Sequence, residues 1–183
     1  MSLLSRPDPV KLVASMIFRE SDWVTRAIDG MSDVYGKPDY ISTVMPFDYT
    51  DYYTAEMGAG LKRRVVSFES LISPDGLPAV KKSTNGVEAA LSRKDRRRVN
   101  IDPGCLSTGH LLLATGKPYA HRPYLGDGVY GDLTLIYRGG FFQELPWTYP
   151  DYREPSMISM LARIREKYLK QLAAVKRNPE ETA

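Results

Sequence analysis

Hydrophobic residues repeat at helical spacing in two long stretches of the chain. The first expected helix begins at Ser21 or Asp22, either of which can cap it, and ends before Gly36 and Pro38. Its apolar positions are Val24, Ala27, Ile28, Met31, Val34 and Tyr35. The second is C-terminal and ends near Asn178-Pro179; its apolar positions are Met157, Leu161, Ile164, Tyr168, Leu172 and Val175. Each pattern is typical of a helix that packs one face on a core.

A weaker helical pattern follows the turn signal Pro74-Asp75-Gly76. Its apolar positions are Leu77, Val80, Val87, Ala90 and Leu91. Asn85-Gly86 lies in the middle of this segment, and a glycine inside a helix costs about 1 kcal/mol relative to alanine. The segment therefore forms either one helix or two short ones.

Runs of apolar, β-branched and aromatic residues between glycine and proline turns predict the strands. Residues 12–18 are mainly apolar, which is typical of a strand buried on both faces. Gly126-Asp127-Gly128 is typical of a hairpin turn. The other expected strands are residues 40–47, 61–71, 99–102, 110–115, 119–125, 129–138 and 141–145.

The order of these elements predicts an α+β fold. Strand, helix, strand, strand, helix, strand is the order of a ferredoxin-like split βαββαβ unit, in which two helices cover one face of an antiparallel sheet. The hairpins after residue 119 extend that sheet or form a second small one, and the amphipathic C-terminal helix completes the fold. We expect a single domain over residues 1–183, with flexible tails at 1–10 and 178–183.

Composition excludes several classes of protein. The 183 residues are 43% hydrophobic and 26% charged and include 14 glycines, values that fit neither a disordered nor a collagen-like chain. The net charge is +3, of which residues 93–98 contribute +4. The rest of the chain is therefore nearly neutral, and its basic character is local.

The sequence also indicates a cytosolic location. The single cysteine, Cys105, cannot form an intramolecular disulfide, and residues 1–10 lack the basic segment and apolar run of a secretory signal. The longest apolar runs, 12–18 and 111–114, are far shorter than the roughly 20 residues that span a bilayer. We expect no membrane passage.

Tyrosines are concentrated in two parts of the chain. Eleven of the twelve lie within residues 35–53 and 119–152. A tyrosine has an apolar body and a polar tip, which suits a cleft or an interface, but it is also a good strand former. Tyr52, Tyr124 and Tyr149 are candidate ligand-binding residues.

The segment 47–58 contains the first polar candidate, Glu56. If Thr50 caps a short helix, Tyr52, Tyr53 and Glu56 share one face, and Glu56 is a candidate acid, base or metal ligand in an aromatic pocket. The alternative is an irregular connection in which Asp48 and Thr50 bind loop amides, and this is the preferred interpretation of Asp48.

A second polar pair comes at the end of an expected strand. Asn100 and Asp102 point to one face of it, and Pro103-Gly104 suits the centre of a type II turn. Asn100 is a candidate ligand-binding residue, and Asp102 is a candidate catalytic group or, with Glu56, a metal ligand. The alternative is that Asp102 simply begins the turn.

The histidines and nearby arginines provide further candidates. His121 is the best general acid or base, whereas His110 is interpreted as a partly buried strand residue. Arg122 is a candidate anion contact or an ordinary surface arginine. In the strand 129–138, Asp132 and Arg138 share a face, which makes Arg138 a second candidate anion contact.

The aromatic segment 146–153 either forms a wall of a ligand site or anchors the final helix. Anchoring is the preferred interpretation, and Asp151 is a candidate polar contributor to a site.

Zinc motifs are missing from the sequence, which leaves only a carboxylate-rich site for a divalent cation such as magnesium. A phosphate loop is missing as well, because Gly109 is too far from Gly116-Lys117 and Pro118 replaces the hydroxyl residue. The sequence has no Gly-x-Ser-x-Gly elbow.

A basic cluster connects the weaker helix to the following strand. It either contacts nucleic acid or is a solvated connection, and the second interpretation is preferred. Its cations are Arg93, Lys94, Arg96, Arg97 and Arg98. The final helix is also basic on its polar face, and we expect it to dock on the sheet rather than on a membrane.

Four motifs occur in order along the chain: NIDPG at 100–104, HRPYLGDG at 121–128, LTLIYR at 133–138 and WTYPDY at 147–152. Together they resemble a bacterial family, the domain of unknown function 4416 family, from about residue 11 to residue 172. The resemblance implies no established activity. Some members are labelled GTP-binding proteins, but this sequence has neither the phosphate loop nor the Asn-Lys-x-Asp guanine motif.

Three hypotheses for function follow. The first is a protein that binds, or acts on, a small anionic or phosphorylated molecule at a tyrosine-rich cleft formed by the candidates above. The second is a noncatalytic RNA-binding module that uses the basic cluster and exposed tyrosines. The third is a protein-interaction subunit, in which the polar candidates are scattered rather than convergent.

Overall fold

The computed structural model describes residues 3–94 and 96–177. The strands are β1 (Val10–Phe18), β2 (Pro38–Ile41), β3 (Met45–Pro46), β4 (Lys62–Ile72), β5 (Val99–Leu106), β6 (His110–Thr115), β7 (Tyr124–Gly126), β8 (Val129–Arg138) and β9 (Phe141–Glu144). The helices are α1 (Ser21–Tyr35), α2 (Thr54–Met57), α3 (Leu77–Leu91), α4 (Pro150–Arg153) and α5 (Pro155–Arg177), with a 3-10 turn η1 (Pro74–Gly76) before α3. The fold is α+β, as predicted.

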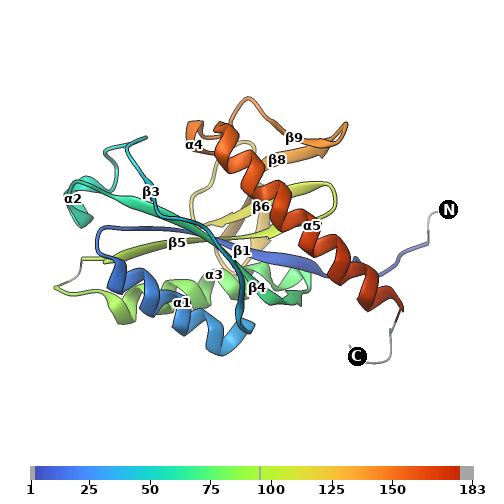
Figure 1. Cartoon of the computed structure of the whole chain (residues 1–183), viewed down its shortest axis with the longest axis horizontal. Helices are drawn as coiled ribbons and strands as arrows, with labels where there is room; N and C mark the ends of the chain where they lie inside the picture. Colours follow the sequence, from blue (N-terminus) through green and yellow to red (C-terminus); the bar gives the residue numbers. More distant parts are fainter. Residues whose placement is uncertain (1–2, 95, 178–183) are drawn as a thin grey trace.

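All the strands belong to one antiparallel sheet. Its order is β2-β4-β1-β5-β6-β8-β7, with β3 also paired to β4 and β9 to β8. Helices α1 and α3 cover one face, and α5 crosses the other (Figure 1). The late hairpins therefore extend the main sheet and do not form a second one.

Strand β1 is the centre of the molecule because both of its faces are covered. All nine of its residues are buried. Leu12, Met16 and Phe18 pack with α1 and α3 on one face, while Val13 packs on the α5 side. Alternate residues of a strand point to opposite faces, so a run that is mainly apolar is what this central position requires.

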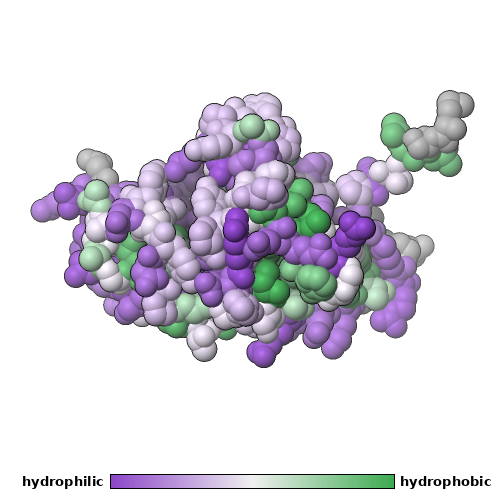
Figure 2. Space-filling model, turned by 90° about the horizontal axis from the view of Figure 1, so that it is seen from above, coloured by the Kyte–Doolittle hydropathy of each residue, from purple (hydrophilic) through white to green (hydrophobic). Residues whose placement is uncertain are grey.

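Helix α5 docks on the sheet through an apolar face, as predicted. Leu161, Ile164 and Tyr168 are at most 1% exposed and pack against the sheet residues Leu111 and Leu135. Seen from above, on the side where α5 lies, the surface shows only small hydrophobic areas among hydrophilic ones (Figure 2). Among the described residues no helix combines the length and apolarity needed to cross a membrane.

Two of the predicted strands were wrong in extent. Residues 40–47 form β2 and β3 with a break between them, where the Ser42 hydroxyl accepts a hydrogen bond from the Val65 amide (3.0 Å). Residues 119–125 contribute only Tyr124 and Leu125 to β7. Pro118 lies just before this stretch and Pro123 lies within it. Both lack the amide that a ladder needs, so the chain turns there instead.

The turn predicted at Pro103-Gly104 was also wrong. Strand β5 continues through both residues, and Pro103 is paired with Ala14 of β1. The pairing of β5 with β6 begins only at Gly104, so Pro103 lies where β5 has an open edge and a missing donor is tolerated.

Helix α3 is one continuous helix of 15 residues. Of the two alternatives for this segment, the single helix is therefore correct despite Asn85-Gly86. The expected end of the last helix at Asn178-Pro179 lies outside the described residues, as does the expected tail 178–183.

Candidate functional site

A cavity of about 800 Å³ opens where β5 and β6 separate. The two strands pair only through Gly104–Leu106 and Leu111–Leu113, so residues 99–103 have no ladder partner on that side. Asn100 and Asp102 from β5 and Ala114 and Thr115 from β6 line the space between the diverging strands. The volume is within the range of small-molecule sites.

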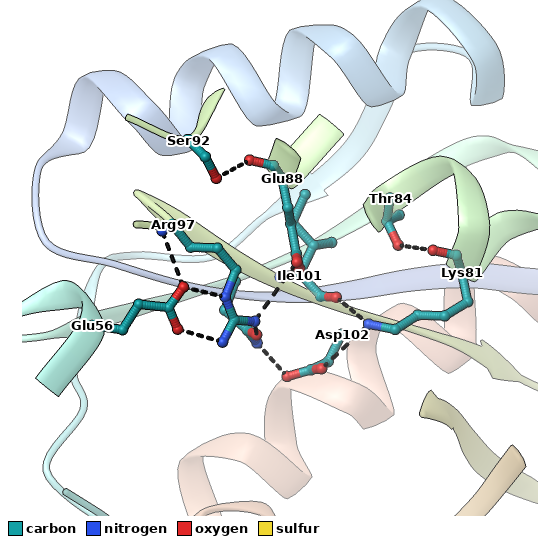
Figure 3. A network of polar contacts seen from close by, with 9 residues as sticks. Glu56, Lys81, Thr84, Glu88, Ser92, Arg97, Ile101 and Asp102 are labelled. Carbon is teal, nitrogen blue, oxygen red and sulfur yellow. Dashed lines mark hydrogen bonds and ion pairs between the residues drawn. The ribbon is translucent and has the colours of Figure 1, made fainter. Parts of the chain in front are cut away.

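Two charged side chains of α3 satisfy the open edge of β5. The amide of Ile101 donates to Glu88 Oε1 (2.5 Å), and the carbonyl of Ile101 accepts from Lys81 Nζ (2.9 Å) (Figure 3). Both side chains are nearly buried, and burial raises the pKa of Glu88 above its ordinary value. They replace the missing strand partner and bring charge from the α3 side of the sheet into the cavity wall.

Arg97 connects α2, α3 and β5 in one network. Glu56 Oε1 accepts from the Arg97 backbone amide (3.0 Å) and from Nε (2.8 Å), and Glu56 Oε2 accepts from Nη2 (2.7 Å). Arg97 Nη1 donates to Asn100 Oδ1 (2.6 Å). The same nitrogen lies 3.7 Å from Glu88 Oε2 (Figure 3). The hydrogen bonds from Arg97 lower the pKa of Glu56, and Glu56 in turn raises the pKa of Arg97.

Asp102 is the least constrained carboxylate of this network. Its Oδ2 accepts from Asn100 Nδ2 (2.8 Å), while Oδ1 lies 3.8 Å from Lys81 Nζ. Its side chain is 33% exposed, compared with 9% for Glu88. Asp102 can therefore accept a hydrogen bond from a molecule in the cavity.

The opposite wall contains two buried ion pairs. Arg63 of β4 pairs with Asp151 of α4 and lies against the rings of Phe47 (4.6 Å) and Tyr152 (5.2 Å). Both side chains of this pair are less than 10% exposed. The pair connects the segment before α5 to the sheet.

In the second pair, Arg122 Nε donates to Asp132 Oδ2 (2.8 Å) and Arg122 Nη2 donates to the Tyr149 hydroxyl (2.9 Å). The side chains of this ion pair are 4% and 5% exposed. Arg122 is therefore not an ordinary surface arginine, and it holds Tyr149 at the cavity.

His121 lies behind this second pair and does not line the cavity. Its Nε2 is 3.7 Å from Asp132 Oδ2, and its ring stacks on Trp147 with centroids 4.9 Å apart. Nε2 is buried without a hydrogen-bond partner among the described residues. His121 thus contacts a cavity residue, Asp132, rather than the cavity itself.

Tyrosines form much of the cavity lining together with Lys117. The Lys117 ammonium lies 3.9 Å from the ring centroid of Tyr52, and both residues are exposed. Burial raises the pKa of Tyr53 and Tyr152 above the ordinary phenol value, so these phenols remain protonated at neutral pH. The lining tyrosines are Tyr49, Tyr52, Tyr53, Tyr149 and Tyr152.

The structure therefore brings together part of the predicted site. The candidates that line the cavity are Asn100, Asp102, Arg122, Tyr52 and Tyr149. Glu56 lies behind Arg97, and His121 lies behind Asp132. Tyr124 packs on Tyr130 outside the cavity, and Arg138 is exposed at the end of β8. The helix predicted from a Thr50 cap begins later, at Thr54, although Thr50 does accept a hydrogen bond from the Tyr52 amide, as a capping residue would.

The basic cluster is partly used inside the protein. Arg97 faces the cavity, and the guanidinium of Arg93 lies over the ring of Trp23 (5.1 Å). Lys94 and Arg96 are exposed, and Arg98 is partly buried. Position 95 lies outside the described residues.

Sequence reasoning missed Lys81, Glu88, Arg63 and Lys117. A signal was present for the first two, because Lys81, Thr84 and Glu88 have the same three- or four-residue spacing as the apolar stripe of α3. Polar residues on the inward face of a helix indicate that they form polar contacts inside the protein. For Lys117 the sequence gives no such signal.

Within residues 3–94 and 96–177, no group of three histidine, cysteine, aspartate or glutamate side chains is placed to hold a metal ion. Asp102 and Glu56, which the sequence suggested as metal ligands, are connected through Arg97 and Asn100 instead.

A family of proteins described as a domain of unknown function (DUF4416) matches residues 8–168. No curated protein and no solved structure matches the chain.

Proposed function

The chain belongs to the family of domain of unknown function 4416, and we propose that it binds a small anionic or phosphorylated molecule in the tyrosine-lined cavity. The observation that carries this proposal is the convergence of charged and aromatic side chains on one space of about 800 Å³. A concave site with a few convergent polar groups among aromatic walls is the usual form of a small-molecule site.

One unpaired charge of the lining favours an anion. The lining cations are Arg63, Lys81, Arg97, Lys117 and Arg122. Within the described residues, Lys117 has no carboxylate at ion-pair distance, whereas the other four each have one. The tyrosines add hydroxyl donors and flat apolar faces.

We assign different roles to the three catalytic candidates. Asp102 contacts the ligand, Glu56 positions Arg97, and His121 acts on the cavity only through Asp132. The alternative of RNA binding has less support, because Arg97 of the basic cluster is bound by Glu56 within the protein. The βαββαβ order supports a ferredoxin-like description of the fold, and a cytosolic location remains part of the proposal.

A thermal-shift screen with a matched pair of variants tests the proposal. Gly116 lines the cavity, Gly109 does not, and a Cβ added at either meets no atom within 4 Å. Gly116→Trp therefore fills the cavity, whereas Gly109→Trp is its control. The panel contains sugar phosphates, nucleotides, small dicarboxylates and a short single-stranded RNA.

We expect a small anion to raise the Tm of the wild type and of Gly109→Trp but not that of Gly116→Trp. A ligand present at 100 times its Kd stabilises the folded state by about 2.7 kcal/mol, which is readily measured. A panel without any such shift contradicts the proposal. A shift only with RNA, unchanged in Gly116→Trp, supports the RNA alternative instead.

A further inference from the structure

Three of the five cations in the cavity wall are already neutralised by close carboxylates. Arg63 pairs with Asp151, and Arg122 pairs with Asp132, in both cases with less than 10% exposure of the side chains. The third, Arg97, donates two hydrogen bonds to Glu56 from its guanidinium and one from its backbone amide. These arginines shape the wall but add little net charge for an incoming anion.

Lys117 is different from the other lining cations. Among the described residues it has no carboxylate within ion-pair distance, whereas Lys81 has Asp102 at 3.8 Å. Its ammonium contacts the ring of Tyr52, which is 60% exposed. An exposed cation–π contact of this kind is worth about 0.5–1 kcal/mol, so an anionic group can readily replace it.

Asp102 supplies the complementary group within the wall. Asn100 fixes one of its oxygens, and the other is without a hydrogen bond from any described residue and 3.8 Å from Lys81. A carboxylate oxygen in this state accepts a hydrogen bond from a hydroxyl donor. Asn85, also in the lining, can bind a second hydroxyl.

From this arrangement we infer that the ligand is a sugar phosphate, bound with its phosphate at Lys117 and its hydroxyl groups at Asp102. This inference rests on the proposed function and adds the ligand class and its orientation. The exposed Lys117 and the carboxylate of Asp102 line the same cavity, and the tyrosine rings of the lining offer apolar faces to a sugar ring.

Calorimetric titration with three related probes tests the inference: ribose 5-phosphate, ribose and inorganic phosphate. Lys117→Met removes the free charge and Asp102→Asn removes the free acceptor charge at nearly constant size. The matched controls are Lys37→Met and Asp29→Asn, two exposed residues outside the cavity. Circular dichroism confirms that each variant is folded.

We expect the wild type to bind ribose 5-phosphate more tightly than either fragment. Lys117→Met lowers the affinity for ribose 5-phosphate by about tenfold or more and leaves the affinity for ribose unchanged. Asp102→Asn lowers the affinity for ribose 5-phosphate and ribose and leaves that for phosphate unchanged. The controls have wild-type affinity.

Three outcomes overturn the inference. If both variants bind ribose 5-phosphate within twofold of the wild type, the orientation is wrong. If the wild type binds other small anions of the screening panel but not ribose 5-phosphate, the ligand class is wrong and the proposed function stands. If no small anion binds at all, the proposed function fails together with the inference.

Discussion

At the scale of single residues, Arg97 decides how the site is assembled. Its guanidinium and its backbone amide both bind Glu56, and its remaining nitrogen reaches Asn100. A planar guanidinium can serve several acceptors at fixed angles, which a lysine cannot do. Arg97 therefore fixes α2 against the start of β5. Asn100 in turn holds Asp102 by donating a hydrogen bond to it.

The ion pair between Glu56 and Arg97 predicts a pH-dependent contribution to stability. Glu56→Gln should lower the free energy of unfolding at pH 7 by about 1–2 kcal/mol, because a charge-assisted pair is lost. Both side chains are partly exposed, and screening by water keeps the loss this small. Denaturant unfolding of both proteins between pH 3 and pH 7 measures the difference.

The sign of this dependence follows from the lowered pKa of Glu56 in the folded protein. The unfolded chain binds the proton more tightly, so the stabilisation is complete above the ordinary pKa of 4.5 and is lost as pH falls through the folded pKa. Asp48→Asn, which changes an exposed acid in the segment before α2, is the control. A difference between wild type and Glu56→Gln that stays constant down to pH 3 would contradict this assignment.

At the scale of elements, the divergence of β5 from β6 creates the cavity. The last pair before the strands separate is Gly104 with Leu113. A Cβ on Gly104 would lie 2.7 Å from the Leu112 carbonyl oxygen and 2.7 Å from Leu113 Cδ2. Only glycine allows the two backbones to approach this closely at the point of divergence.

Gly104→Ala should therefore lower the free energy of unfolding by about 1–3 kcal/mol, because backbone atoms must move to admit the methyl group. It should also weaken ligand binding, since the cavity wall begins at this pair. Chemical denaturation measures the first effect, and titration with the ligand measures the second.

Gly86→Ala is the matched comparison and should act in the opposite direction. Gly86 lies inside α3, and a Cβ there meets no atom within 4 Å. Alanine is better than glycine in a helix by about 1 kcal/mol, so the free energy of unfolding should rise by up to that amount. Equal effects of the two substitutions would show that the close approach at Gly104 has no energetic importance.

At the scale of the whole molecule, the sheet is stabilised from both sides. The core between the sheet and α1 and α3 and the core under α5 share the buried strand β1. A buried ion pair between Lys11 and Asp39, with Lys11 also donating to Gln171 (2.7 Å), connects β1, β2 and α5. Burial lowers the pKa of Lys11, and the contact with Asp39 opposes this effect.

Because the two cores share β1, we expect the three layers to unfold together as the single predicted domain. Ile164→Ala in α5 should lower the free energy of unfolding by about 2–4 kcal/mol, since Ile164 is fully buried. Leu169→Ala on the exposed side of the same helix should have a small effect. Far-UV circular dichroism and tyrosine fluorescence should give coincident transitions for both; separate transitions would show that α5 unfolds independently.

Much of the fold could be predicted from local patterns, whereas the site could be predicted only in part. The helical spacing predicts α1 and α5, and the apolar run predicts β1. These predictions agree with the structure because burial of those apolar faces supplies the main driving force for folding. Pro103-Gly104 misled the prediction, since a proline is a turn signal only where its neighbours do not pair. Asn100 and Asp102 both line the cavity, because alternate residues of a strand point to the same face and this alternation is a local property.

The sequence by itself determined which faces are buried, the order of the elements and the fact that tyrosines gather near polar groups. Only the tertiary structure decided which charges meet. Lys81 and Glu88 reach β5 because that strand has an open edge, and Arg97 faces Glu56 from a distant segment. The physical reason is the separation along the chain over which each property is set. Hydrophobic periodicity depends on residues that are close in sequence, whereas ion pairs depend on distances between segments that only the folded chain brings together.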